Sequence, residues 1–330
     1  MRALVTGGTG FIGSHLVDEL LDHGYEVHVL RRPTSSMTNL GRKPLTITVG
    51  DLTNTRSLMK ACQDIDVVFH VAAIPRDWGS RKEFFEVNLY GTKNLLDACV
   101  ENAVPRFVFM SSAAVYGFPN TTQPITEDFP KKPTPKYGES KHRAELLLWE
   151  YGVNHNMVVS ALRSPLVTGP RDTMIAPFLI SALQQKRLFY IGTGDQKISI
   201  SDGRDVAHCL RLAGEASTAS GHAYNVKSFD CTPKILIETL AETLHVPAPT
   251  AHRSYRGTYL LAGMIEGIWT VRRQKNPPLT RYKVKVLGHT RVIDIQKAEQ
   301  QLRYTPKYTY ESTIKDTVSW YTQSKEPALI

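Results

Sequence analysis

Cysteine and long apolar runs are scarce in this chain of 330 residues. The four cysteines are scattered without metal-ligand spacing, so we expect no metal site and small buried thiols in a reducing compartment. They are Cys62, Cys99, Cys209 and Cys231. The apolar stretch at 258–269 contains Glu266 and is shorter than the ~20 residues that span a bilayer. The first predicted strand begins at residue 2 and leaves no room for a secretory signal, so we expect a cytoplasmic protein.

Blocks of one charge are also missing, although the chain carries a net charge of +9. Basic residues are spread along the sequence without an arginine-rich block, so we expect no nucleic-acid partner. The positive balance instead favours small anionic ligands or an anionic lipid surface. Apolar residues make up 42% of the chain, which is enough for one large or two closely packed globular domains.

Short β-branched runs alternate with helical patterns through the first half of the chain. Strands are predicted at 3–7, 25–30, 45–51, 66–73, 106–110 and 157–162, and helices at 11–23, 55–63, 84–102 and 137–152. This alternation predicts an α/β fold, a Rossmann-type doubly wound parallel sheet with right-handed crossovers. We expect a dinucleotide-binding domain over 1–165, interwoven with later strands around 190–230, and a smaller α/β substrate-binding region over 166–330.

A glycine-rich segment, "TGGTGFIG", lies between the first predicted strand and the first predicted helix. Gly8, Gly10 and Gly13 fit the G-x-G-x-x-G spacing, and Gly7 precedes them. Glycines at this point allow a sharp turn and the approach of a pyrophosphate to the free N–H groups at the helix start. The strand-to-helix setting favours a dinucleotide site over a merely structural turn.

The residues after the second predicted strand indicate which dinucleotide binds. Arg31 and Arg32, followed by Ser35, suit the 2′-phosphate of NADP, whereas a carboxylate at this place would favour NAD. We therefore expect NADP, with NAD as the alternative cofactor and two solvated arginines as the structural alternative. Asp51, at the end of the third predicted strand, is expected either to receive the adenine amino group or to cap the following helix.

Tyr137 and Lys141 stand four residues apart on a predicted helix, which places them on one face. Alone, this spacing is more often chance than chemistry. However, Ser111 and Ser112 end a neighbouring strand, and ligands of such sheets bind at the carboxyl ends of the strands. An ammonium beside a phenol favours the phenolate and lowers the pKa of the tyrosine toward the working pH.

Together, "TGGTGFIG", "HVAA" at 70–73, "VNLYGTKN", the serine motif and "YGESK" resemble the extended short-chain dehydrogenase/reductase family over essentially the whole chain. The resemblance implies a catalytic triad of Ser112, Tyr137 and Lys141; Ser112 is preferred to Ser111 because it stands four residues before the tyrosine of "VYG". It also implies a homodimer that pairs the helices at 84–102 and 137–152. The residues expected to bind the cofactor are Gly7, Thr9, Gly10, Phe11, Ile12, Gly13, Arg31, Arg32, Ser35, Asp51, Leu52, Val71, Ala72, Ala73, Asn88, Tyr137, Lys141, Ser164 and Pro165.

Two departures from the family pattern bear on the substrate. Leu166 stands where sugar-nucleotide epimerases carry an asparagine, and Asp202 stands where the family often has a histidine. The segments "PPLTR", "KAEQQLRYTP" and "TVSWY" instead resemble the 3β-hydroxysteroid and sterol-4-carboxylate dehydrogenase branch, with the NADP-using dihydroflavonol reductases as relatives.

The resemblance implies an oxidoreductase for a secondary alcohol or ketone on a mainly apolar small molecule. A nucleotide-sugar epimerase or dehydratase with tightly bound NAD, and a non-catalytic NADP-binding redox sensor, are the alternatives. The segment 258–271 is expected either to line an apolar pocket, to contact a membrane surface, or simply to pack on its own domain.

Overall fold

In the computed structural model, which describes residues 1–275 and 277–325, seven parallel strands form the central sheet in the order β10-β6-β5-β4-β1-β2-β3. Their bounds are β1 Arg2–Thr6, β2 Glu26–Arg31, β3 Thr46–Val49, β4 Val67–His70, β5 Arg106–Met110, β6 Val158–Arg163 and β10 His222–Asn225. The strand order reverses between β1 and β4, which creates a crevice at the carboxyl ends of the strands. The predicted Rossmann-type fold is confirmed.

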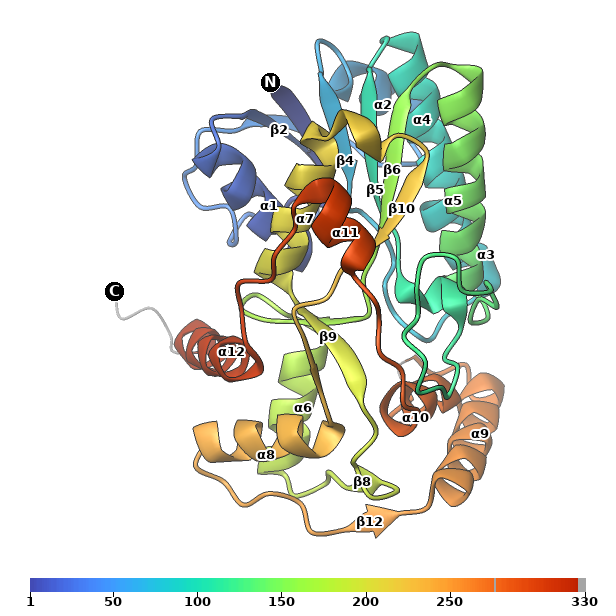
Figure 1. Ribbon diagram of the computed structural model, residues 1–330, viewed down its shortest axis with the longest axis vertical. Helices are drawn as coiled ribbons and strands as arrows, with labels where there is room; N and C mark the ends of the chain where they lie inside the picture. Colours follow the sequence, from blue (N-terminus) through green and yellow to red (C-terminus); the bar gives the residue numbers. More distant parts are fainter. Residues whose placement is uncertain (276, 326–330) are drawn as a thin grey trace.

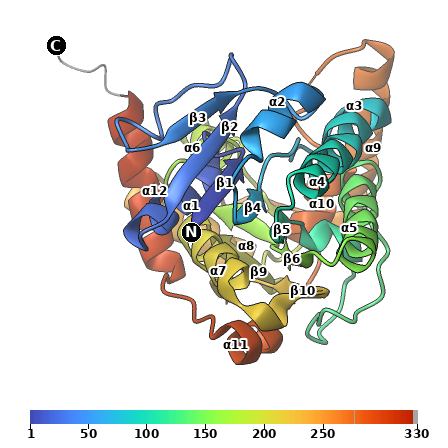
Figure 2. The same ribbon diagram turned by 90° about the horizontal axis from the view of Figure 1, so that it is seen from above.

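Helices cover both faces of this sheet (Figures 1 and 2). One face carries α1 (Phe11–Asp22), α7 (Gly203–Glu215) and α11 (Gln296–Leu302), and the other carries α2 (Thr55–Ala61), α4 (Gly91–Glu101) and α5 (Tyr137–Asn154). The central strands β1, β4, β5 and β6 are mainly apolar and mostly buried, as expected for strands that are covered on both faces.

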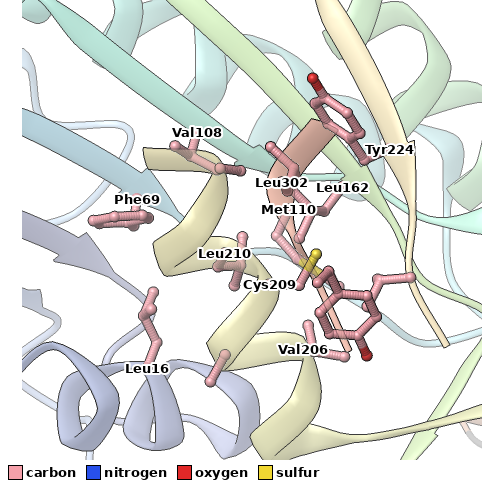
Figure 3. Packing of buried hydrophobic residues seen from close by; sticks show 14 of the residues in the cluster. Leu16, Phe69, Val108, Met110, Leu162, Val206, Cys209, Leu210, Tyr224 and Leu302 are labelled. Atoms are coloured by element: carbon pink, nitrogen blue, oxygen red, sulfur yellow. The ribbon is translucent and has the colours of Figure 1, made fainter. Parts of the chain in front are cut away.

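The core between α1, α7 and the sheet is shown in Figure 3. Leu16, Phe69 and Leu210 are fully buried there. Gly214 lets the end of α7 approach the sheet, since an added Cβ would lie 2.6 Å from the Phe69 ring. Close packing of this kind fixes the sheet that positions the loops at its carboxyl edge.

A second region follows beyond the carboxyl ends of the strands (Figure 1). It contains a three-stranded sheet of β7 (Leu166–Thr168), β9 (Ile198–Asp202) and β11 (Phe229–Cys231), and a two-stranded sheet of β8 (Tyr190–Ile191) and β12 (His252–Arg253). Its helices are α6 (Ile175–Gln184), α8 (Pro233–Thr243), α9 (Tyr255–Val271), α10 (Arg281–Gly288) and α12 (Tyr310–Lys325). The predicted boundary at 165 stays a prediction; residues 276 and 326–330 of the second predicted region lie outside the described residues.

The predicted helix at 84–102 differs in detail from the structure. It begins earlier, as α3 (Arg81–Phe85), because Ser80 and Glu83 form a capping box. It then widens into a π-helical turn, η1 (Glu86–Tyr90), before continuing as α4. Such turns are frequent at functional sites. Here the turn contains Asn88, whose side chain is buried.

Candidate active site

The glycine loop after β1 has the geometry of a phosphate cradle. Gly7 has φ +73°, and a Cβ there would lie 2.7 Å from the backbone nitrogen of Ala72. A Cβ at Gly13 would overlap the carbonyl of Gly7. Gly10 is the N-cap residue of α1 and offers no side chain to the first-turn N–H groups. Those groups, from Phe11 onward, are therefore available to an anion such as a pyrophosphate.

The loop after β2 lies against this cradle. The Nδ2 atom of Asn39 donates a hydrogen bond to the Thr9 carbonyl at 3.4 Å, a contact that the sequence did not suggest. Arg31 is half-buried and its Nη1 donates to the carbonyls of Arg32, Pro33 and Ser35. Arg31 thus shapes the loop, whereas the Arg32 side chain is exposed to solvent.

Asp51 and Leu52 lie at the end of β3. The Asp51 carboxylate accepts hydrogen bonds from the backbone and hydroxyl of Thr53, and Asn54 caps the following helix α2 instead. The alternative expectation that Asp51 caps this helix is therefore wrong, because the turn through residues 51–54 moves the helix start beyond it. The Leu52 carbonyl accepts a hydrogen bond from Asn94 of α4 at 2.9 Å, which holds this turn to the helix layer that also contains α2.

Asn88 ties the "HVAA" segment to the helix that bears the tyrosine. Its Oδ1 accepts from the Ile74 backbone at 2.8 Å, and its Nδ2 donates to the Ser140 hydroxyl at 3.0 Å. Val71, Ala72 and Ala73 directly precede this clamp. The amide of Asn88 is thus occupied by the protein, so it orients the segment rather than presenting a free amide to a ligand.

Ser112, Tyr137 and Lys141 come together at the carboxyl ends of β5 and β6. Tyr137 begins α5, is 9% exposed and lies close enough to the Ser112 hydroxyl for that group to influence its pKa. Ser111 instead donates its hydroxyl to Glu145 inside the core, which leaves Ser112 as the serine at the tyrosine. Lys141 is 1% exposed one turn later, and its Nζ lies 4.3 Å from the ring centroid of Phe109.

Burial dominates the electrostatics of this triad. Burial raises the pKa of Tyr137, and the hydrogen bond with Ser112 partly offsets this. Burial lowers the pKa of Lys141 to about 7, while the negative charge of Glu145 opposes the change. The protein environment alone therefore does not lower the tyrosine pKa, and the predicted lowering by Lys141 stays a prediction for the ligand-bound site.

The backbone just before Tyr137 is strained. Lys136 has φ +65° and ψ −79°, and the Tyr137 amide donates to the Pro135 carbonyl at 2.9 Å. This is a γ-turn with positive φ, which is rare for a residue with a side chain. The Lys136 ammonium secures it by donating to the Gly79 carbonyl at 2.9 Å. Such strain clusters at functional sites, where the surroundings hold a side chain in position.

A buried ion pair between β6 and α5 holds the helix that carries Tyr137 and Lys141. It was not predicted from the sequence. Arg163, at the end of β6, donates from Nε and Nη2 to both carboxylate oxygens of Glu145 on α5. Its Nη1 also donates to the Tyr116 hydroxyl at 3.0 Å. Burial alone would lower the pKa of Arg163, but the bonds to Glu145 raise it on balance. The pair thereby fixes α5 against β6 and places a negative charge one turn beyond Lys141.

Ser164 and Pro165 follow β6 directly at the same edge of the sheet. The Ser164 carbonyl accepts from the Ala113 amide at 2.8 Å, and its hydroxyl donates to Ser201 at 3.0 Å. Ser164 therefore joins the serine loop to the second region.

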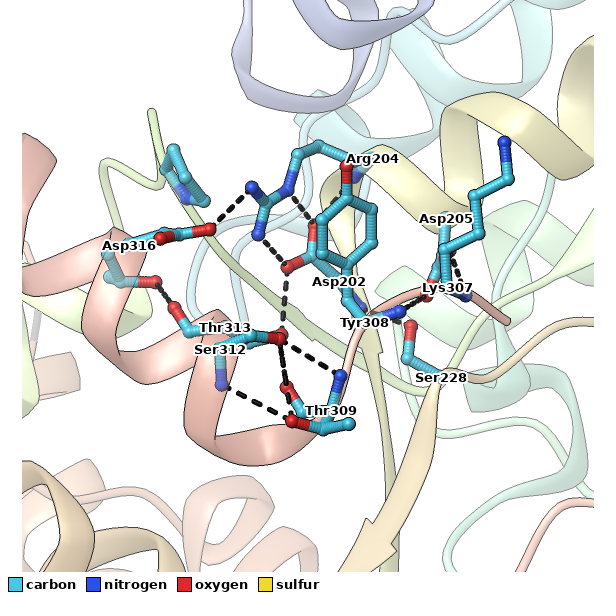
Figure 4. A network of polar contacts seen from close by, with 12 residues as sticks. Asp202, Arg204, Asp205, Ser228, Lys307, Tyr308, Thr309, Ser312, Thr313 and Asp316 are labelled. Carbon is cyan, nitrogen blue, oxygen red and sulfur yellow. Dashed lines mark hydrogen bonds and ion pairs between the residues drawn. The ribbon is translucent and has the colours of Figure 1, made fainter.

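Asp202 has a structural role (Figure 4). It caps α7 by accepting from the Arg204 amide, and its other oxygen accepts from the Thr313 hydroxyl at 2.8 Å. Arg204 in turn donates to Asp316 at 2.7 Å. The network joins α7 to the C-terminal helix α12, so the residue that departs from the family pattern holds the two regions together.

A glycine-rich loop before α1, a topological switch point and a Ser-Tyr-Lys cluster with a buried tyrosine and lysine are typical of dinucleotide-dependent enzymes of the Rossmann class. The model of the NAD dependent epimerase/dehydratase family matches residues 3–226, and the chain belongs to this family. It is an enzyme of the extended short-chain dehydrogenase/reductase type.

Two curated relatives are dehydrogenases or reductases by name. The chain is 28% identical to the sterol-4-alpha-carboxylate 3-dehydrogenase, decarboxylating, of Mus musculus, over 96% of this chain and 90% of the relative. It is 27% identical to the 2-alkyl-3-oxoalkanoate reductase of Stenotrophomonas maltophilia, over 96% and 98%. Among solved structures, the UDP-glucuronic acid 4-epimerase from Bacillus cereus in complex with NAD matches with a TM-score of 0.79 and 26% identity, covering 99% and 100% of the two chains.

Proposed function

We propose that the protein is an NAD(P)-dependent oxidoreductase acting on a secondary alcohol or ketone of a mainly apolar substrate. The observation that carries this proposal is the buried Tyr137 phenol close to the Ser112 hydroxyl, with the buried Lys141 one helical turn away. The glycine cradle and the α1 N-terminus fit the pyrophosphate of a dinucleotide at the same edge of the sheet.

A dinucleotide held by the glycine loop and the N-terminus of α1 would supply the hydride donor or acceptor for the substrate carbon. Tyr137 exchanges a proton with the substrate oxygen, and Ser112 donates a hydrogen bond to that oxygen as negative charge develops on it. Lys141 contributes a positive charge near the phenol when it is protonated. Tyr137 and Lys141 are buried and Ser112 is half-buried, which limits the access of water and strengthens these interactions.

The substrate class is supported by the relatives and by two residues of this chain. The names of two relatives mention a sterol carboxylate and an oxoalkanoate. Both compounds combine an apolar body with a carboxylate. Leu166 supplies an apolar side chain at the position where sugar-nucleotide epimerases are expected to carry an asparagine, and Asp202 is occupied by structural contacts. These features favour an apolar alcohol or ketone over a sugar nucleotide.

NADP is the proposed cofactor because the loop after β2 carries exposed positive charge. Calorimetric titration is expected to show at least ~10-fold tighter binding of NADP⁺ than of NAD⁺, or ~1.4 kcal/mol. Arg32→Ala should lower the affinity for NADP⁺ and leave that for NAD⁺ unchanged. Arg42→Ala, which removes another exposed arginine of the neighbouring loop, is the matched control. Equal affinities of the wild type for both cofactors would contradict the preference.

The second candidate function is a nucleotide-sugar epimerase, favoured by the likeness to the Bacillus cereus enzyme in its NAD complex. Such an enzyme keeps its NAD through the cycle, so non-exchanging NAD in the purified protein would support it. A rise in melting temperature with UDP-sugars would support it further. A non-catalytic redox sensor is the third reading, and it requires cofactor binding without turnover.

We also propose that α9 contacts a lipid surface. Leu260, Met264, Ile268 and Val271 are 69%, 64%, 46% and 84% exposed and share one face of the helix. Exposed basic residues follow at 272, 273 and 275, which suits an anionic headgroup layer. Among the described residues no helix is long and apolar enough to cross a bilayer. Flotation with phosphatidylserine vesicles tests the contact; a protein that stays unbound at low salt would contradict it.

The assembly is proposed to be a homodimer through α4 and α5. Exposed apolar side chains on this layer include Tyr90, Leu146 and Val153, at 57%, 50% and 83%. Leu146→Glu is therefore expected to produce monomers in analytical ultracentrifugation. A wild type that is already monomeric at micromolar concentration would contradict the proposal. The four free, buried cysteines support the proposed cytoplasmic setting.

A further inference from the structure

Arg291 is a buried arginine without an ion-pair partner among the described residues. It is 3% exposed, and its Nη1 atom has no hydrogen-bond partner. The Arg291 backbone pairs with the start of β9. Its amide donates to the Lys197 carbonyl, and its carbonyl accepts from the Ser199 amide. No carboxylate of the described residues forms an ion pair with it. Leaving a guanidinium buried in this way costs free energy that a bound anion would recover.

The titratable groups around Arg291 are Tyr282, His289, Lys285 and, beside Tyr282, Asp77. Burial lowers its pKa to about 10, and Tyr282 opposes this. Burial also lowers the pKa of His289, which feels the positive charges of Lys285 and Arg291. The Asp77 carboxylate lies near Tyr282 and accepts a hydrogen bond from the Thr280 hydroxyl at 2.5 Å, and it forms no ion pair with Arg291. The Arg291 guanidinium therefore has donors that a carboxylate could still accept from.

This site adjoins the catalytic tyrosine. The Arg291 guanidinium lies 4.4 Å from the ring centroid of Phe118, and that ring packs against the apolar cluster containing Tyr137. Phe118 also contacts Tyr282 edge to face, with centroids 4.9 Å apart. Tyr282 is close enough to Tyr137 that the charge of one phenol raises the pKa of the other. Arg291 is thus linked to Tyr137 through Phe118 and Tyr282.

We propose that Arg291 binds a carboxylate on the carbon next to the reacting carbon of the substrate, so that the enzyme acts on 3-hydroxy or 3-oxo acids. The inference rests on the proposed function, because it places the reacting oxygen at Tyr137. In this arrangement one hydrogen bond joins the phenol to the substrate oxygen, and another joins the substrate carboxylate to the guanidinium. With ordinary hydrogen-bond lengths, the phenol oxygen and the guanidinium nitrogen would be roughly 8 to 9 Å apart. A guanidinium presents paired donors that match both oxygens of a carboxylate.

The test compares an acid with its own ester. The probes are a 2-alkyl-3-hydroxyalkanoate and its methyl ester, oxidised with NADP⁺ and followed by absorbance. The wild type is expected to prefer the acid by at least ~30-fold in kcat/KM, the range of a charged hydrogen-bonded pair. Arg291→Met should remove this preference by lowering the acid's kcat/KM ~30-fold, with the ester within ~3-fold of the wild type.

The controls separate binding from folding. Arg291→Met is expected to melt no lower than the wild type, since it replaces an unpaired buried charge with an apolar chain. Arg281→Met, which removes an exposed arginine of the same segment that pairs with Glu266, should leave both substrates unchanged. Arg291→Lys should retain part of the acid preference because it retains the charge.

Two outcomes would overturn the proposal while the proposed function stands. One is a wild type that oxidises acid and ester equally. The other is an Arg291→Met variant that melts lower and loses both substrates alike, which would make Arg291 a structural residue. Oxidation of neither probe, together with copurified NAD and turnover of a UDP-sugar, would instead remove the proposed function itself.

Discussion

Lys141, a member of the proposed triad, is expected to lower the free energy of unfolding of the protein. Burial lowers its pKa from 10.5 to about 7, so the folded protein releases a proton that the unfolded chain retains. One pKa unit corresponds to about 1.4 kcal/mol, which gives a penalty of about 4 kcal/mol at pH 7. The contact of its ammonium with Phe109 offsets about 1–2 kcal/mol of this. Replacement by methionine, a chain of similar length, is therefore expected to stabilise the protein by about 2–4 kcal/mol at pH 7.

The pH dependence gives the sharper test. The lysine's pKa is lower in the folded than in the unfolded state, so the penalty is complete below pH 7 and vanishes above pH 10.5. The stability gained by Lys141→Met should therefore shrink by about 2 kcal/mol between pH 7 and pH 9. Denaturant unfolding of the cofactor-free protein at the two pH values measures it.

Lys93→Met is the matched control, because this lysine is half-exposed on α4 and pairs with Asp97 at the surface. It should change the free energy of unfolding by less than ~1 kcal/mol at either pH. A Lys141→Met variant that is less stable than the wild type, or whose gain does not vary with pH, would refute the reasoning. The variant should also lose at least ~100-fold in turnover, since stability and activity are opposed at this position.

Three further substitutions test the supporting structure. Gly13→Ala should weaken cofactor binding at least ~100-fold in calorimetry, because its Cβ would displace the glycine loop, whereas Gly267→Ala has open space around it and should leave binding unchanged. Arg163→Met should cost about 3–5 kcal/mol in denaturant unfolding, since it strands the buried Glu145 charge, and a smaller loss than ~1 kcal/mol would contradict the network's importance. Asp202→Ala should lower stability by about 1–3 kcal/mol through the lost cap and the lost contact with α12, and Asp202→Asn should recover the capping part.

The sheet and the glycine loop were predictable because their signals are local. Alternating apolar runs and helical patterns identify the βα units, and parallel pairing follows from their crossovers. The helix bearing Tyr137 and Lys141 is likewise readable from spacing along one face. The predicted strand and helix positions in the first half therefore agree with the structure to within a few residues, apart from the π-helical turn around Asn88.

The remaining features depend on partners far apart in the sequence. Arg163 looks like an ordinary strand-end residue until the fold brings Glu145 to it. The structural role of Asp202 becomes visible only when the fold brings Thr313 and Arg204 to it, two residues that are more than 100 positions apart in the sequence. The unpaired state of Arg291 is a property of its three-dimensional surroundings, because only the fold shows that none of the carboxylates in 1–275 and 277–325 forms an ion pair with it. Local pattern carries no information on such contacts.

The central claim is a hydride transfer between a nicotinamide and a substrate carbon, assisted by Tyr137. The most direct measurement supplies NADPH deuterated at C4 with a 2-alkyl-3-oxoalkanoate and examines the product by mass spectrometry, with Tyr137→Phe run in parallel. The account predicts one deuterium on the new carbinol carbon, and at least ~100-fold slower formation by the variant with cofactor affinity unchanged. Product without deuterium, or equal rates for the two proteins, would contradict it.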